Sequence, residues 1–266
     1  MRRCLPVLFC LCVAGCASTA SQPAAFDLTK FRVVDLTHPL GSKTIFWPTS
    51  TERFALKVIA HGQTPQGYFY AANNFCTPEH GGTHLDAPMH FGEGKWTADQ
   101  IPVERLVAPA VVIDATQKAS SNPNYRLTRQ DVLDFESAHG RIAAGSIVLM
   151  RTDWSRRWPD VKAYLGDDTP GDASKLSFPS FGEDAAKLLV EERQVGVLGV
   201  DTASTDYGQS TDFVVHRLAA ARNVPGLENL KNLDQLPVIG AVVVALPTPI
   251  EGGSGGPLRA VALVPR

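Results

Sequence analysis

The amino-acid sequence predicts an α/β fold with a mixed sheet, and three observations lead to that prediction. Short apolar segments with the length of buried strands recur along the chain, bounded by Gly, Pro or polar residues. Fewer segments have the amphipathic pattern of helices, so strands outnumber helices. The chain has 266 residues, of which 44% are hydrophobic and 20% are charged. This length and composition favour one large soluble domain over two small ones.

The predicted strands run through the whole chain after its first thirty residues. Residues 31–36 (FRVVDL) alternate between apolar and polar side chains, and residues 238–246 (VIGAVVVAL) form the longest apolar strand. The glycine run at 252–256 predicts a turn before the last strand. The remaining predicted strands are 54–60, 67–75, 107–114, 147–151, 195–200 and 259–264.

Three segments are predicted to be helical. The first begins after Thr128, whose side chain can cap it, with Asp131 at the third helical position in an acidic variant of the capping box. Gly140 is expected to end this helix. Residues 181–193 are amphipathic, and residues 213–222 form the third predicted helix.

The N-terminus has the pattern of an export signal. A short positive start precedes an apolar run at 5–13, which is too short to span a bilayer. The small residues before Cys16 indicate a lipoprotein signal over residues 1–16, followed by a flexible tether at 17–30. Ordinary signal cleavage after Ala20 is the alternative. We expect a periplasmic protein or a lipoprotein anchored at Cys16 and facing the periplasm.

Charge and cysteine usage narrow the function classes. The net charge is −2, and removal of residues 1–16 leaves 23 basic and 27 acidic residues, hence −4. No basic cluster is present in the sequence, which argues against nucleic acid and favours a small-molecule partner. Cys76 alone of the five cysteines lies beyond the signal, so no internal disulfide is expected.

The most informative segment is HGGTHLDAPMH, which places His80, His84, Asp86 and His90 within eleven residues. Imidazole and carboxylate groups together are typical ligands of Zn²⁺, Mn²⁺ or Fe²⁺. His84 and Asp86 are two residues apart, so an extended segment points both to the same side. A tight glycine turn before them would return His80 to the side of His84. A histidine-rich loop without any role is the alternative.

Two downstream residues are candidates to complete this metal site. His216 lies in the predicted helix at 213–222, where a histidine is more often a packed core residue than a ligand. Glu228 lies between leucines, and burial of an unpaired carboxylate is costly. A metal or a histidine partner would remove that cost.

Four sequence features together resemble the metal-dependent cyclase-like hydrolase family, which includes bacterial kynurenine formamidase and isatin hydrolase. They are HGGTHLDAPMH at 80–90, VDTASTD at 200–206, the spacing from His216 to Glu228, and the closing GGSGGPLRAVALV. The resemblance covers residues 31–266. It implies a swivelling β/β/α cyclase-like domain with a mixed sheet, which assembles as a homodimer or homotetramer.

The resemblance also implies roles for individual residues. Residues at the positions of His80, His84 and Asp86 bind the catalytic metal, and the residue at the position of His90 is an acid/base candidate. His216 and Glu228 match positions that complete the metal centre or bind a second ion. Gln209 resembles an amide ligand of isatin hydrolase, where Mn²⁺ is used, although a surface amide is an equal alternative.

The resulting hypothesis is a metal-dependent amidohydrolase with Mn²⁺ or Zn²⁺. It would use metal-activated water to open a cyclic amide such as isatin, or an aryl formamide such as N-formylkynurenine. We expect Asp86 and His90 to be the catalytic residues, with His90 moving the proton to the leaving nitrogen. Glu79 could orient a ligand imidazole. The aromatic residues expected to stack on the substrate, or else to be core residues, are Phe46, Trp47 and Tyr70.

Three other functions stay open at this point. The same site could serve a lactonase or a polyketide-type cyclase or dehydratase, which would share the metal chemistry. The protein could instead be a non-catalytic periplasmic metal- or ligand-binding protein, although simple capture needs no acid/base such as His90. A structural lipoprotein with a vestigial site is the third alternative. Because kynurenine formation is normally cytoplasmic, the export signal favours an isatin-like substrate.

Overall fold

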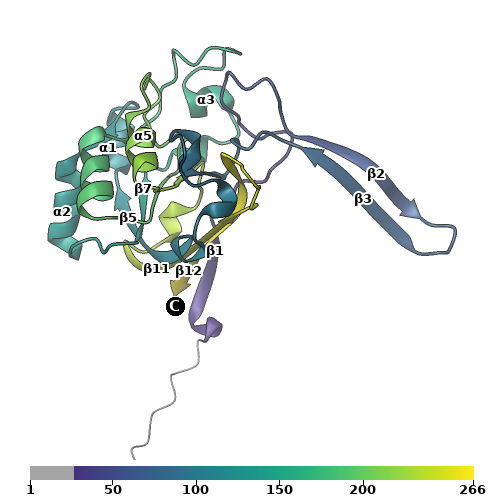
Figure 1. Cartoon of the computed structure of the whole chain (residues 1–266), viewed down its shortest axis with the longest axis horizontal. Helices are drawn as coiled ribbons and strands as arrows, with labels where there is room; N and C mark the ends of the chain where they lie inside the picture. Colours follow the sequence, from purple (N-terminus) through teal and green to yellow (C-terminus); the bar gives the residue numbers. More distant parts are fainter. Residues whose placement is uncertain (1–26) are drawn as a thin grey trace, which may run out of the picture.

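The computed structural model describes residues 27–266 and has one central mixed sheet of eight strands (Figure 1). β4 pairs with β12 as well as with β10, so the sheet closes on itself as a barrel. The strands, in sheet order, are β1 (Phe31–Asp35), β12 (Gly255–Pro265), β11 (Ile239–Pro247), β5 (Val107–Asp114), β7 (Ile147–Arg151), β9 (Val197–Val200), β10 (Gly226–Glu228) and β4 (His84–Asp86).

Half of this sheet is parallel and half antiparallel, which confirms the predicted mixed sheet. β5, β7, β9 and β10 run parallel to one another, whereas β11, β12, β1 and β4 pair in the antiparallel sense. On β7, Ile147 and Leu149 belong to the core inside the barrel, whereas Val148 and Met150 belong to a second core on its outer face. This alternation is why the segment is apolar throughout.

Helices cover the outer face of the parallel strands (Figure 1). They are α1 (Thr116–Ser121), α2 (Arg129–His139), α4 (Glu183–Lys187) and α5 (Val214–Ala221). A further helix, α3 (Val161–Leu165), does not lie on this face. α2 begins and ends where the sequence predicts, because Thr128 and Asp131 form the capping box and Gly140 follows with φ +90°. α4 continues as a π-helical turn, Leu188–Glu192.

The remaining short elements connect these strands and helices. A two-stranded pair joins β6 (Arg126–Leu127) to β8 (Ser180–Phe181). The 3-10 turns are η1 (Leu28–Lys30), η2 (Pro88–His90), η3 (Ala98–Gln100), η4 (Val103–Arg105), η5 (Trp154–Arg157) and η7 (Leu233–Gln235).

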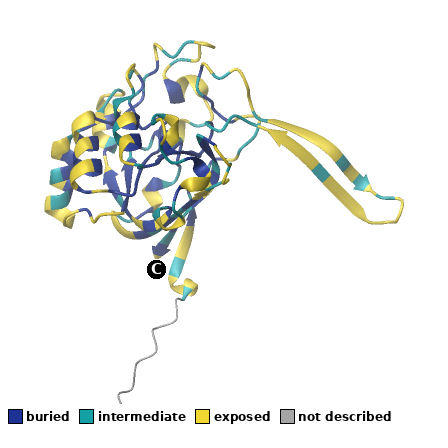
Figure 2. Ribbon diagram, viewed as in Figure 1, coloured by how far each residue is buried: buried dark blue, intermediate teal, exposed yellow. Residues whose placement is uncertain are grey.

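β2 (Ala55–Gln63) and β3 (Phe69–Cys76) form a hairpin that projects from the body, and we call residues 55–76 the arm (Figures 1 and 2). Both strands were predicted, but they pair only with each other and not with the central sheet. Most of the arm is exposed, including Val58 at 60% and Phe75 at 64%. The arm therefore presents apolar side chains to solvent.

The prediction of a turn across 252–256 is wrong for its last two residues. Gly255 and Gly256 begin β12 and pair with Asp86 and Leu85 of β4. A Cβ on Gly255 would lie 2.5 Å from the Leu85 carbonyl oxygen, so glycine is needed for this close approach. The glycine run thus closes the barrel beside the metal-ligand segment.

The predicted signal at 1–16, with Cys16, lies outside the described residues, as does most of the predicted tether at 17–30. The described end of that tether contains η1, which Asp27 caps. In the described part of the chain, residues 27–266, no helix has the length and apolar character needed to cross a membrane.

Candidate metal centre

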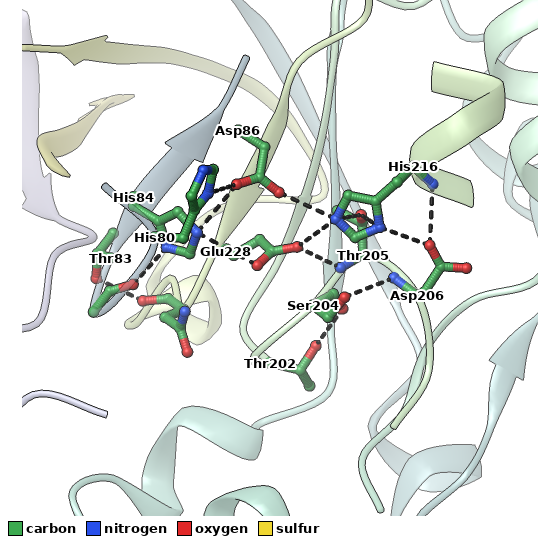
Figure 3. A network of polar contacts seen from close by, with 12 residues as sticks. His80, Thr83, His84, Asp86, Thr202, Ser204, Thr205, Asp206, His216 and Glu228 are labelled. Carbon is green, nitrogen blue, oxygen red and sulfur yellow. Dashed lines mark hydrogen bonds and ion pairs between the residues drawn. The ribbon is translucent and has the colours of Figure 1, made fainter. Parts of the chain in front are cut away.

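The barrel's closing strand positions the first candidate ligands. His84 and Asp86 lie on the same side of β4, and His84 Nε2 is 3.1 Å from Asp86 Oδ1, as the two-residue spacing predicts. β10 pairs with β4 so that Glu228 lies opposite His84, with Glu228 Oε2 3.6 Å from His84 Nε2. The Thr205 amide donates to Glu228 Oε1 at 2.8 Å and fixes the carboxylate (Figure 3).

The glycine turn brings His80 to the same cluster, as predicted. Gly82 has φ +61°, which favours glycine. The His80 and His84 rings lie edge to face with centroids 5.3 Å apart. His80 Nδ1 is 2.6 Å from Asp86 Oδ1. The motif therefore gathers two imidazoles around one carboxylate oxygen.

His216, on α5, reaches the cluster from the opposite side (Figure 3). Its Nε2 lies 3.1 Å from Asp86 Oδ2 and 3.2 Å from Glu228 Oε1. The structure shows that His216 is a member of the cluster, buried among its polar groups. Its other ring nitrogen, Nδ1, is 2.6 Å from Asp206 Oδ2, and Asp206 also accepts the His216 backbone N–H. Sequence reasoning missed Asp206 as a site residue, although it ends the VDTASTD segment.

The donor set fits a divalent metal. Asp86 and Glu228 are only 4% and 5% exposed, so their two negative charges need a buried counter-charge. His84 Nδ1 lies 2.9 Å from the Gly82 carbonyl, an acceptor only, so Nδ1 carries the proton. Its Nε2 lone pair then faces carboxylate oxygens, which also carry lone pairs. A cation between these atoms would bind both sets of lone pairs and remove the repulsion between them. Three imidazoles with two carboxylates suit Zn²⁺ or Mn²⁺.

The pKa shifts of the cluster indicate how protons compensate the negative charges of Asp86 and Glu228 when no cation is bound. Burial alone would lower the pKa of His84, but the hydrogen bond and charge of Asp86 outweigh burial and raise it to about 9. The pKa of His216 is raised well above its usual value because Asp206, Asp86 and Glu228 together outweigh its burial. Burial would raise the pKa of Asp86, but its three imidazole neighbours outweigh burial and hold this pKa well below its usual range. Burial and the charge of Asp86 raise the pKa of Glu228.

His90 lies beside the ligands, on η2. Its ring stacks on His80 with centroids 3.8 Å apart and an interplanar angle of 17°. Burial lowers the pKa of His90 to about 4, so this imidazole is neutral at pH 7 and can accept a proton. His90 is thus a neutral imidazole next to the candidate metal ligands.

These residues form the floor of a cavity of about 240 Å³. This volume lies below the roughly 300–1,000 Å³ of sites for drug-sized ligands, so a smaller molecule fits. The walls are mainly apolar and contain Phe46 and Trp47, two of the predicted stacking residues. Phe91 and Phe213 also line the cavity and were missed, although Phe91 follows His90 and Phe213 lies three residues before His216.

Two predicted site residues lie away from the cavity lining of this chain. Tyr70 is on β3 of the arm and 53% exposed, because the arm leaves the body. Gln209 is exposed in a turn. The preceding Gly208 is held outside the cavity, since its N–H donates to the Phe178 carbonyl and a Cβ there would touch Leu176. The oxygens that face the imidazoles in this chain belong to Asp86 and Glu228.

Comparisons with known proteins agree with this geometry. The family model Cyclase, described as "Putative cyclase", matches residues 34–207. The chain belongs to this Cyclase family. It is 38% identical over 247 residues to isatin hydrolase from Roseibium aggregatum, covering 88% of this chain and 92% of that protein. It is 26% identical to kynurenine formamidase from Salinibacter ruber, covering 86% and 96% of the two chains.

Solved structures of the family have the same fold. The structure of isatin hydrolase A from Ralstonia solanacearum superposes with a TM-score of 0.82 at 40% identity, covering 89% of this chain and 93% of that one. An isatin hydrolase bound to the product analogue thioisatinate gives a TM-score of 0.82 at 35% identity, covering 90% and 94%. Within the Cyclase family, the chain is a metal-dependent amide hydrolase, as its likeness to isatin hydrolase and kynurenine formamidase indicates.

We expect the metal-free Cyclase-family protein to lose stability as the pH rises from 7.5 to 9. The pKa of His84 is about 9 in the folded chain and near 6.5 when unfolded, so its stabilisation is fully present below pH 6.5 and is lost as the pH rises through 9. The loss should be on the order of 2 kcal/mol between pH 7.5 and 9. Urea unfolding of chelator-treated protein across this range measures it.

The metal-loaded protein is the control for this measurement. A metal occupies the imidazole lone pair and replaces the proton, so the decline should shrink. Metal-free protein that gained stability over the same range would contradict the assigned shift.

Proposed function

We propose that the protein hydrolyses a small cyclic aromatic amide of the isatin type, opening its ring. The observation that carries this proposal is the His90 ring stacked on His80 beside a cluster of three imidazoles and two carboxylates, in an aromatic-walled cavity. The 38% identity to isatin hydrolase over most of the chain supports the choice of substrate class.

The residues that would hold the metal are His80, His84, Asp86, His216 and Glu228. A divalent metal there, which we propose to be Mn²⁺ or Zn²⁺, supplies water activation and polarisation of the amide carbonyl. The chain supplies the remaining steps.

His90 and the cavity walls perform those steps. As a neutral imidazole, His90 accepts a proton from the attacking water and returns it to the leaving nitrogen, so that nitrogen departs as an amine. Phe46 and Trp47 pack against the aromatic ring and exclude water from the cavity. The cavity thus orients the amide over His90.

An aryl formamide is the second candidate substrate. The family contains kynurenine formamidase, and the same floor would serve the hydrolysis of N-formylkynurenine. The lower identity of 26% to that relative and the predicted export signal favour the isatin type. A lactone or a cyclase-type substrate would use the same metal chemistry, and its turnover is an outcome of the test below.

The test measures metal content and turnover of the purified protein on isatin, N-formylkynurenine and an aryl lactone. We expect stoichiometric Mn²⁺ or Zn²⁺ and ring opening of isatin, with activity lost on chelation and restored by the same metal. Turnover of the formamide or the lactone alone would replace the proposed substrate. Full activity without metal would contradict the hydrolase mechanism.

The His90→Gln variant tests the proton transfer within the same experiment. We expect it to retain its metal while kcat falls by about 10²- to 10⁴-fold. His139→Gln, at the end of α2 and away from the site, is the matched control and should keep wild-type activity. Ligand binding without turnover in both wild type and His90→Gln would indicate a binding protein instead.

We also propose that the protein assembles as a homodimer or homotetramer. The arm exposes apolar side chains on both strands, and a solvated two-stranded ribbon is only marginally stable. The outward side of β1 and β11 is apolar as well, with Val33 61% and Leu246 44% exposed. Two separate apolar surfaces of one chain suit burial against further copies of itself.

Light scattering during size-exclusion chromatography tests the contribution of the arm. The double variant Val58→Asp/Phe75→Asp places two charges on its apolar surface and should reduce the molecular mass to that of a smaller assembly. Gln66→Glu/Asn74→Asp adds the same charges at exposed polar positions of the arm, with Asn74 opposite Lys57 and not opposite Val58, and should leave the mass unchanged. A wild-type chain that is monomeric at micromolar concentration would contradict the proposal.

We propose that the chain is a periplasmic lipoprotein anchored at Cys16, on the basis of the signal pattern at 1–16. Fractionation should find the full chain in the membrane fraction. Cys16→Ser should release it from that fraction if lipidation is the anchor. Release of the wild-type chain to the soluble periplasm would favour cleavage after Ala20.

A further inference from the structure

We propose that Ser254, held by Glu79, is a positioning residue that fixes which nitrogen of His80 faces the metal. The inference rests on the proposed function of the metal centre. It assigns a role to the glycine-rich segment at 252–256, to which the proposed reaction gives none.

The contacts form a directional chain. The Ser254 hydroxyl and backbone N–H both donate to Glu79 Oε2, at 2.5 Å and 3.0 Å. Because the hydroxyl proton points to Glu79, the hydroxyl oxygen is left to accept from His80 Nε2, 2.8 Å away. The proton of His80 therefore lies on Nε2. The lone pair on Nδ1 then faces Asp86, 2.6 Å away, on the metal side.

The other two imidazoles of the metal centre have partners that fix the position of the ring proton directly. The outer nitrogen of His84 meets the Gly82 carbonyl, and that of His216 meets Asp206. Both partners can only accept, so each fixes its imidazole directly. A serine hydroxyl can donate or accept a hydrogen bond. Because the Ser254 hydroxyl donates to Glu79, it accepts from His80.

Close packing holds the segment against both partners. A Cβ on Gly253 would lie 2.8 Å from Glu79 Oε1, and one on Gly255 would lie 2.7 Å from His80 Cε1. Glycine at these positions lets Ser254 reach between Glu79 and His80. Because His90 stacks on His80, the same segment also supports the position of the base.

The test measures Zn²⁺ and Mn²⁺ affinity of the purified protein by competition with a chromophoric chelator. Ser254→Ala should lower the affinity by about 10- to 100-fold, the usual effect of losing an outer partner of a metal-bound histidine. Ser254→Thr keeps the hydroxyl and should restore near wild-type affinity. Glu79→Gln should lower the affinity, because an amide does not fix the direction of the hydroxyl.

Asp99→Asn is the matched control. Asp99 accepts the Gly252 backbone N–H at 3.1 Å, so it holds the same segment without acting on His80. The metal affinity of the Asp99→Asn variant should equal that of the wild type. A loss as large as that of Ser254→Ala would show that the segment's general stability, and not the hydroxyl, sets the affinity.

Activity at saturating metal separates the effect of Ser254 on metal affinity from its effect on the position of His90. We expect kcat of Ser254→Ala to stay reduced, because His90 depends on the His80 ring, while KM changes less. Wild-type protein that binds no metal would overturn the proposed function. Wild type and Ser254→Ala that bind metal equally would overturn this inference alone.

Discussion

The burial of two carboxylates at the closing seam of the barrel is the constraint on which the site depends. Asp86 lies on β4, which pairs with both β10 and β12, and Glu228 enters from β10 in register with His84. The strands that close the barrel are therefore also the ones that bring the negative charges together. Such charges stay buried only if cations or protons compensate them. The fold and the metal chemistry thus have a common origin in this seam.

Each of the three imidazoles has a further acceptor for its outer nitrogen. Gly82, Asp206 and the Ser254–Glu79 pair take the outer N–H groups, and they come from three separate parts of the chain. Because the acceptors are fixed by the fold, the inner nitrogens converge before any metal arrives. This pre-organisation lowers the conformational cost of binding the ion.

The sequence predicts the local parts of this arrangement and not the remote ones. The same-side placement of His84 and Asp86, and the return of His80, follow from strand geometry and a glycine turn within seven residues. Ser254 lies 174 residues from His80, and only the closure of the sheet brings them together. No local periodicity records such a contact. The same holds for Gly255 and Gly256, which are turn formers by composition but strand residues in the barrel.

The arm marks another limit of sequence reasoning. Alternation predicts that β2 and β3 are strands, and they are, but it does not tell whether a strand joins the central sheet or leaves it. For this reason Tyr70, which was expected to stack on the substrate or to be a core residue, lies on the arm. A similar argument applies to Gln209, since the resemblance gave its position along the chain but not the outward direction of its turn.

The arm also couples local order to assembly. A two-stranded ribbon gains little from its own hydrogen bonds, and its apolar side chains gain nothing while they face water. Its order therefore depends on the surface that covers it. If further copies of the chain provide that surface, the folding of the arm and the association of the subunits are one equilibrium. The candidate metal ligands lie apart from the arm, because they come from β4 and the turn before it, from β10 and from α5.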